Sequence, residues 1–104
     1  MNKEILPYRF TKRAAKELKK IKKSDKVLFL KIEEAIIKIR KNPNIGTVKK
    51  GDLKGYLFLD IYHSRSNYEL CYALIEDEVD EVVLIVLIGT RENFYSDLKR
   101  YLNK

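Results

Sequence analysis

The chain has only one cysteine, one histidine and no tryptophan among its 104 residues. The single cysteine, Cys71, cannot form an internal disulfide, and the lack of a Cys/His cluster argues against a structural zinc site. The longest apolar run, Val82–Ile88, is far shorter than the roughly 20 residues of a transmembrane helix. The N-terminal stretch Met1–Pro7 lacks the apolar core of a signal peptide. These absences predict a cytoplasmic protein without a metal, a cofactor or a membrane anchor.

The sequence also lacks repeats, low-complexity tracts and a linker. Hydrophobic residues make up 45% of the chain and charged residues 36%, which is typical of a folded globular protein. We therefore expect one domain, residues 1–104, with one modest hydrophobic core.

The net charge of +7 is unevenly distributed along the chain. Residues 11–50 carry fourteen Lys or Arg and four Asp or Glu, a net charge of +10. Residues 51–90 carry two Lys or Arg and eight Asp or Glu, a net charge of −6. The basic half can form a field that collects polyanions, or its lysines can solvate two amphipathic helices.

The first half of the chain predicts a short strand followed by two helices. Tyr8–Phe10 is the expected strand, and Thr11 is a suitable N-cap for a helix to about Ile21. Residues 22–24 are expected to form a turn. A second helix, capped by Ser24 or Asp25, continues to about residue 41, because apolar residues recur there at helical spacing. The Asn-Pro pair at 42–43 ends it, so the helices should form an antiparallel hairpin.

After a loop at residues 44–54, the second half predicts three strands and a last helix. The strands are expected at 56–62, 68–75 and 81–88, the third of them central because it is almost entirely apolar. An acidic turn at 76–80 joins the last two. A helix is expected from Glu92 to Leu102. The predicted fold is α+β with the order βααβββα, an antiparallel meander with the helical hairpin packed on it and a C-terminal helix.

Two side chains that can act on a phosphodiester directly follow the third strand. Arg91 can bind a phosphate in bidentate fashion, and Tyr95 can stack on a base or move a proton. If the helix begins at Glu92, the two residues are one helical turn apart on one face. Phe94 is then expected in the core and Tyr95 nearer the surface. On a basic chain, this pairing points to RNA.

Several segments in this order resemble the RelE/ParE superfamily of toxins from toxin–antitoxin pairs. The resemblance extends over about residues 8–102. The segments that carry it are Ala14–Lys20, the Asn-Pro turn Asn42-Pro43, Lys50–Gly55, Asn67–Tyr72 and Gly89–Tyr95. Each motif is weak alone, but together and in order they are fairly specific.

The resemblance implies a toxin of a type II pair that a cognate antitoxin protein holds inactive. Many members are endoribonucleases that cut messenger RNA, commonly on the ribosome. In these, the RNA 2′-hydroxyl attacks the adjacent phosphate, so no metal is needed. A ParE-like branch instead inhibits DNA gyrase and cuts nothing.

The resemblance also assigns roles to residues of this chain. Arg91 matches an arginine that binds phosphate or stabilises the phosphorane, and Tyr95 matches a tyrosine that acts as base or stacks on the substrate. Lys50 matches a lysine along the RNA path, with Lys49 and Lys54 near it. The alternatives are a surface arginine, a core aromatic and loop lysines that only contact solvent.

Three further residues are weaker candidates. His63 and Arg65 lie in the predicted turn at 62–67, where they can serve as acid or base and as a phosphate contact, or contact only solvent. Glu69 stands where ribonuclease members often have an arginine; a carboxylate there can act as a base or orient an arginine, and Glu69 can pair with Arg91 across adjacent strands. Asp60 also lies near this site. Because these acidic residues differ from the ribonuclease pattern, inhibition of DNA gyrase remains an alternative to mRNA cleavage. An RNA-binding module without cleavage is a third possibility.

Overall fold

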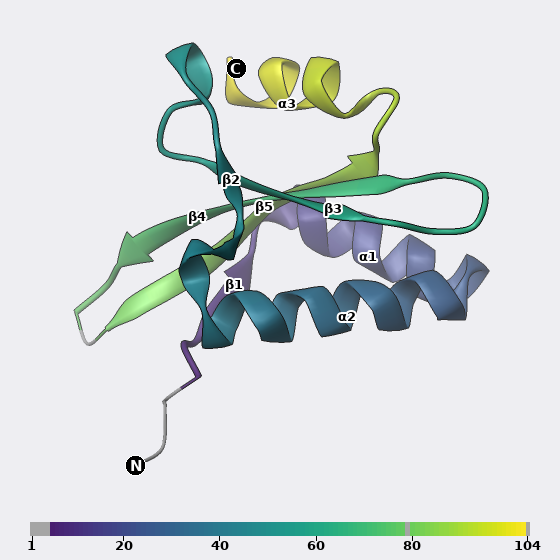
Figure 1. Ribbon diagram of the computed structural model, residues 1–104, viewed down its shortest axis with the longest axis horizontal. Coiled ribbons are helices and arrows are strands. Elements are labelled where there is room, and N and C mark those ends of the chain that lie inside the picture. Colours follow the sequence, from purple (N-terminus) through teal and green to yellow (C-terminus); the bar gives the residue numbers. More distant parts are fainter. Residues whose placement is uncertain (1–4, 79, 104) are drawn as a thin grey trace.

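The computed structural model describes residues 5–78 and 80–103 (Figure 1). In chain order the elements are β1 (Tyr8–Phe10), α1 (Lys12–Ser24), α2 (Lys26–Lys41), β2 (Thr47–Val48), β3 (Leu57–Ile61), β4 (Tyr68–Glu76), β5 (Glu81–Thr90) and α3 (Phe94–Leu102). Short 3-10 turns at Pro43–Ile45 and Gly51–Leu53 flank β2. The predicted α+β order is confirmed, with β2 as an additional strand inside the predicted loop. Residue 79 of the acidic turn lies outside the described residues.

Side-chain caps begin both helices of the hairpin. The Thr11 hydroxyl accepts a hydrogen bond from the Ala14 amide at 3.0 Å, and the Asp25 carboxylate accepts one from the Leu28 amide at 3.1 Å. The turn predicted at residues 22–24 is wrong, because α1 runs on to Ser24 and Asp25 alone separates the helices. An extended Asp25 ends one helix and starts the next.

The sheet has the strand order β1-β5-β4-β3-β2. The meander β3-β4-β5 is antiparallel as predicted, whereas β1 joins β5 in parallel, so the sheet as a whole is mixed. β5 has a neighbour on each side and is buried along most of its length, which confirms its expected interior position.

Three layers result, with the helical hairpin on one face of the sheet and α3 on the other (Figure 1). The larger core lies under the hairpin and is formed mainly by Ala14, Ile21, Leu28, Ile32, Ile36, Ile39, Leu70, Tyr72, Val83, Ile85 and Ile88. The smaller core lies under α3 and contains Leu53, Phe58, Cys71, Val86, Leu87, Phe94 and Leu98. Four of the candidate functional residues, Lys49, Glu69, Arg91 and Tyr95, lie at one end of this smaller core.

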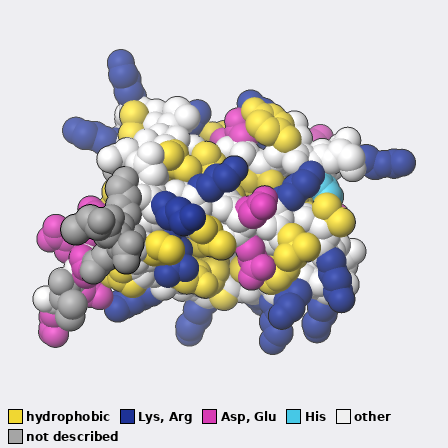
Figure 2. Space-filling view, turned by 60° about the horizontal axis from the view of Figure 1, so that its bottom comes forward, with side chains coloured by type: hydrophobic (Ala, Val, Ile, Leu, Met, Phe, Trp, Pro, Cys, Tyr) yellow, Lys and Arg dark blue, Asp and Glu magenta, His cyan; other side chains and the backbone are white. Residues whose placement is uncertain are grey.

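The surface of the hairpin side mixes all side-chain types (Figure 2). Lys and Arg side chains project mostly around its rim, and hydrophobic and acidic side chains lie between them (Figure 2). The exposed apolar residues of α2 are Val27, Leu30 and Ile37. On this face the basic first half of the chain therefore forms a mixed surface and not one continuous cationic field.

A β-bulge interrupts the pairing of β4 with β5. Cys71 pairs with Leu87 and Tyr72 with Ile85, which leaves Val86 as the extra residue. The Thr11 hydroxyl donates a hydrogen bond to the Val86 carbonyl at 2.8 Å. One threonine thus caps α1 and satisfies the carbonyl group that the bulge frees.

Replacing Thr11 by valine should therefore destabilise the fold at both places. Thr11→Val keeps the side-chain shape, but it removes the cap of α1 and leaves the Val86 carbonyl without its donor. We expect a loss of about 2 kcal/mol in the free energy of unfolding, roughly half from each hydrogen bond. Urea denaturation measures this difference, and Thr11→Ser, which keeps the hydroxyl, is the control. A Thr11→Val chain as stable as the wild type would contradict the double role.

A buried tyrosine fixes the loop that carries β2. The Tyr72 hydroxyl donates to the Pro43 carbonyl at 2.7 Å and accepts from the Gly46 amide at 2.9 Å. A Cβ atom at Gly46 would come within 2.7 Å of the same hydroxyl, so this position needs glycine. These two hydrogen bonds tether the loop to the sheet and so fix the positions of Thr47 and Lys49.

Candidate active site

Two carboxylates lie side by side on the sheet face that α3 covers. Asp60 of β3 and Glu69 of β4 are cross-strand partners, so their side chains leave the sheet on the same side. The residues next to them, Ile61 and Leu70, enter the core under the helical hairpin instead. Asp60 is half-buried, whereas Glu69 is only 5% exposed.

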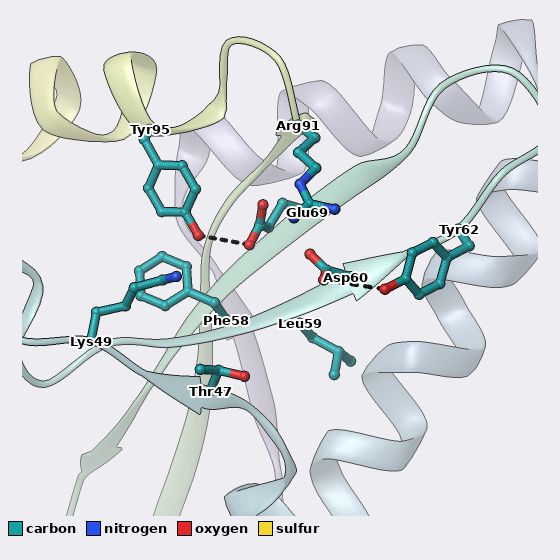
Figure 3. Close-up of a pocket in the computed structure, with 9 residues that line it drawn as sticks. All are labelled: Thr47, Lys49, Phe58, Leu59, Asp60, Tyr62, Glu69, Arg91 and Tyr95. Carbon is teal, nitrogen blue, oxygen red and sulfur yellow. Dashed lines mark hydrogen bonds between the residues drawn. The ribbon is translucent and has the colours of Figure 1, made fainter.

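The bulge in β5 directs Arg91 to this same face. Ile85 packs under the helical hairpin, but Val86 and Leu87 both pack under α3, so the alternation shifts by one residue. Arg91 follows β5, its amide donates to the Asn67 carbonyl at 2.9 Å, and its side chain extends over the carboxylates (Figure 3). Without the bulge, strand alternation would place Arg91 on the opposite face.

Tyr95 reaches the site from the first turn of α3. The helix begins at Phe94, so the predicted start at Glu92 is wrong and Arg91 lies in the turn before the helix. The expected spacing of Arg91 and Tyr95 along one helical face therefore does not apply, although both line one pocket. As predicted, Phe94 is buried and Tyr95 is more exposed.

The Tyr95 hydroxyl donates a hydrogen bond to Glu69 Oε2 at 2.7 Å (Figure 3). The other carboxylate oxygen, Oε1, is buried and has no hydrogen-bond partner among the described residues. Burial raises the pKa of Glu69; the bond from Tyr95 opposes this rise, and the nearby negative charge of Asp60 adds to it. Burial and the Glu69 carboxylate together raise the pKa of Tyr95 well above its ordinary value. The phenol therefore remains protonated near neutral pH, and the carboxylate is a stronger base than an exposed glutamate.

A lysine from the tethered loop covers the aromatic wall of the site. The Lys49 ammonium lies 5.2 Å from the centroid of the Tyr95 ring and 5.6 Å from that of Phe58. These distances suit cation–π attraction, which orients both the lysine and the phenol. Lys49 thus adds a second positive charge to the site on the side opposite Arg91 (Figure 3).

Together these side chains enclose a pocket of about 370 Å³ (Figure 3). It is lined by Thr47, Lys49, Phe58, Leu59, Asp60, Tyr62, Glu69, Arg91 and Tyr95. Two cationic side chains face two carboxylates, so the pocket is not simply basic. It combines a guanidinium, a group that can bind a phosphate, with a hydrogen-bonded phenol and carboxylate, two groups that can exchange a proton.

The structure brings four of the eight predicted site residues together: Lys49, Glu69, Arg91 and Tyr95. The expected partner of Glu69 was Arg91, but its hydrogen bond comes from Tyr95, and Arg91 acts on it through its charge. The four others, Lys50, Lys54, His63 and Arg65, do not line this pocket.

His63 has a different environment from the one predicted. Its Nε2 lies 2.8 Å from Asp25 Oδ2, and its Nδ1 lies 3.3 Å from Lys31 Nζ. The Leu28 amide and His63 lower the pKa of Asp25. The histidine ring is 14% exposed, so it is neither part of the pocket nor a solvated turn residue. It joins the β3–β4 hairpin to the start of α2.

Sequence reasoning missed the role of Phe58 and Tyr62 as pocket walls. In β3, Leu57, Leu59 and Ile61 alternate with Phe58 and Asp60, and Tyr62 follows the strand on the side of Phe58 and Asp60. A residue pattern of aromatic, acidic, aromatic at every second position was the available signal.

Among residues 5–78 and 80–103, no three His, Cys, Asp or Glu side chains are grouped closely enough to hold a metal ion. Within the same described ranges, no helix has the length and apolar character needed to cross a membrane.

Comparison with solved structures supports the architecture. A YoeB/ParE toxin from Agrobacterium tumefaciens superposes with a TM-score of 0.68 at 14% identity, over 83% of this chain and 99% of that one. The E. coli toxin RelE, as a double arginine-to-alanine mutant in the free state, has a TM-score of 0.68 at 23% identity, over 93% of this chain and 98% of that one. A YoeB dimer from Staphylococcus aureus has a TM-score of 0.64 at 23% identity, over 83% of this chain and 97% of that one. At these identities the likeness establishes the fold.

No curated protein sequence matches the chain. A family model does, over residues 9–99, and it describes a ParE-like toxin of type II bacterial toxin–antitoxin systems. The matched segment includes β2 to β5, β1 without Tyr8 and most of α3, and with them the whole pocket. The chain therefore belongs to the ParE-like toxin family of type II bacterial toxin–antitoxin systems.

Proposed function

We propose that this toxin inhibits translation by cutting messenger RNA, with the RNA 2′-hydroxyl as the nucleophile and the ribosome as the place of action. The observation that supports the proposal is the Tyr95–Glu69 hydrogen bond beside Arg91 in one pocket. A nucleophile within the substrate requires no metal. An activity on ribosomes belongs in the cytoplasm, and membership of the family implies a cognate antitoxin as the partner.

Arg91 is the proposed phosphate ligand. Its guanidinium extends into the pocket from the turn after β5, where the Asn67 carbonyl fixes its backbone. A guanidinium offers two parallel donors to a phosphate and keeps its charge at any physiological pH. As the 2′-oxygen attacks, charge accumulates on the phosphorane, and a donor already in place stabilises it without reorganisation. Lys49 supplies a second positive charge on the same pocket.

Tyr95 and Glu69 form the proposed proton relay. The phenol takes the proton of the attacking 2′-hydroxyl and passes its own proton along the 2.7 Å hydrogen bond to Glu69. The buried carboxylate suits this role, because the raised pKa of Glu69 makes it a stronger base. The bond from phosphorus to the 2′-oxygen forms, the bond to the 5′-oxygen breaks, and the 5′-oxygen takes a proton from water. The products are a 2′,3′-cyclic phosphate and a 5′-hydroxyl.

The second candidate function is inhibition of DNA gyrase without cleavage. Asp60 and Glu69 balance the charges of Lys49 and Arg91, so the pocket attracts a polyanion less than a purely basic site does. Lys50 and Lys54, two of the predicted RNA contacts, lie outside it. The family model that matches is also the ParE-like one.

Induced expression followed by primer extension on cellular messenger RNA separates the two functions. Cleavage predicts new 5′ ends soon after induction, spaced by codons if the ribosome presents the substrate. Intact messenger RNA together with DNA damage would instead support gyrase inhibition. Co-expression of the antitoxin is the control, since it should suppress either effect.

A further inference from the structure

The pocket around Arg91 continues over an open edge of the sheet. β2 pairs only with Leu57 and Phe58 of β3, so no strand covers residues 59–61 on that side within the described structure. A second pocket, of about 290 Å³, lies beyond this edge between β3 and α2. The two pockets share three residues, Leu59, Asp60 and Tyr62. A bound chain can therefore pass from one pocket to the other without leaving the surface.

An aromatic ring and a carboxylate stand where the two pockets meet. Tyr62 is 65% exposed, the largest exposure of any aromatic residue described, and its hydroxyl donates to Asp60 Oδ2 at 3.5 Å. The exposed face of this ring is a flat surface next to the Arg91 pocket on which a nucleobase can stack. On the α2 side, Lys31 and Lys38 bring positive charges to the second pocket, which Glu34 also lines.

We propose that Tyr62 and Asp60 form a nucleobase subsite for a nucleotide that flanks the scissile phosphate, and that the base bound there carries an exocyclic amino group. This inference rests on the proposed function, because the subsite is defined relative to the scissile phosphate that Arg91 is proposed to bind. The base stacks on the Tyr62 ring, and its amino group donates to the Asp60 carboxylate. Lys38 then contacts the next phosphate along the strand.

The carboxylate decides which bases fit. Cytosine, adenine and guanine each have an amino group that can donate to Asp60. Uracil has no amino group, and its one donor on the pairing edge, N3–H, lies between two carbonyl oxygens that the carboxylate repels. Stacking on an aromatic ring does not distinguish between bases, so Tyr62 contributes affinity and Asp60 contributes base specificity. The expected result is a preference against uracil at one position beside the cut.

A peptide strand is the other possible occupant of an open edge. Only residues 59–61 are unpaired there, which is a short template for a strand, and the side chains at this edge are a large ring and an acid that continue the Arg91 pocket. These features favour an RNA strand over a peptide.

The test maps every 5′ end of cellular messenger RNA after induction of wild type, Asp60→Asn, Tyr62→Ala and Tyr62→Phe. Asparagine can both donate and accept, so Asp60→Asn should lose the discrimination against uracil by about tenfold. This readout is a ratio between cut sites in one sample, so it is independent of any change in overall rate. Tyr62→Ala should lower cutting by about tenfold, and Tyr62→Phe, which keeps the ring, should restore it. Tyr8→Ala is the control, because Tyr8 is exposed on the opposite edge of the sheet.

The outcomes separate this inference from the proposed function. No cuts with the wild type would overturn the function itself. Wild-type cuts with an unchanged base preference in Asp60→Asn and an unchanged rate in Tyr62→Ala would overturn the subsite alone. Variants that cut like the wild type but escape neutralisation by the antitoxin would assign this edge to a peptide instead.

Discussion

Arg91→Ala is expected to abolish growth arrest on induction while leaving the fold intact. In the proposed function the guanidinium of Arg91, which lines the pocket from the turn after β5, stabilises the phosphorane. Loss of a preorganised donor of this kind costs about 10²-fold or more in rate. Arg91 is exposed and contributes nothing to either core, so the free energy of unfolding should change by less than about 0.5 kcal/mol. Growth curves, messenger RNA integrity and circular dichroism measure these quantities together.

Two further variants sharpen this result. Arg91→Lys keeps a positive charge but loses the bidentate geometry, so its activity should fall between those of the wild type and the alanine variant. Arg13→Ala, on the exposed face of α1, removes the same type of side chain far from the pocket and should keep full activity. A folded Arg91→Ala chain that still cuts messenger RNA at the wild-type rate would remove the basis of the proposed site.

Glu69→Gln is expected to inactivate the toxin without weakening the fold. The glutamine oxygen still accepts the hydrogen bond from Tyr95, but it cannot take the proton, so the relay ends at the phenol. Loss of a general base costs about 10²- to 10⁴-fold in rate. Tyr95→Phe removes the other half of the relay and should inactivate the chain as strongly if the phenol moves a proton; if the ring only stacks on RNA, activity should largely survive.

The pH dependence of stability provides a separate check on Glu69. Because folding raises the pKa of Glu69, the folded chain binds this proton more tightly than the unfolded chain. The contribution of Glu69 to the free energy of unfolding is therefore fully present below the ordinary glutamate pKa. It is lost as the pH rises through the raised pKa of the folded chain. Glu69→Gln does not titrate, so its stability relative to the wild type should rise across that window. A constant difference between the two chains at all pH values would contradict the burial effect.

The elements of this fold were largely predictable because they depend on local patterns. Thr11, a suitable N-cap, identified the start of α1, and the helical spacing of apolar residues identified α2. The parallel pairing of β1 with β5 was not predictable, because nothing local to Tyr8–Phe10 specifies which strand it joins. β2 is only two residues long and is held by its tether to Tyr72, a contact between distant parts of the chain.

The candidate site was predictable in its residue types but not in its geometry. Arg91 and Tyr95 were identified from their place after an apolar strand. The position of Arg91 relative to Tyr95 depends on the bulge at Val86, which moves Arg91 to the other face of the sheet. No residue pattern in β5 predicts this bulge. The partner of Glu69 depends in turn on where α3 begins. These features arise from tertiary packing, so sequence reasoning named the right groups and paired them wrongly.

In the proposed mechanism the pocket cuts RNA through the 2′-hydroxyl by means of the Tyr95–Glu69 pair. The most direct test is the chemistry of the ends that appear in messenger RNA after induction of the wild type and of Glu69→Gln. We expect 2′,3′-cyclic phosphates and 5′-hydroxyls with the wild type and a loss of both with the variant. Intact messenger RNA with the wild type, or the same new ends with Glu69→Gln at an undiminished rate, would contradict it.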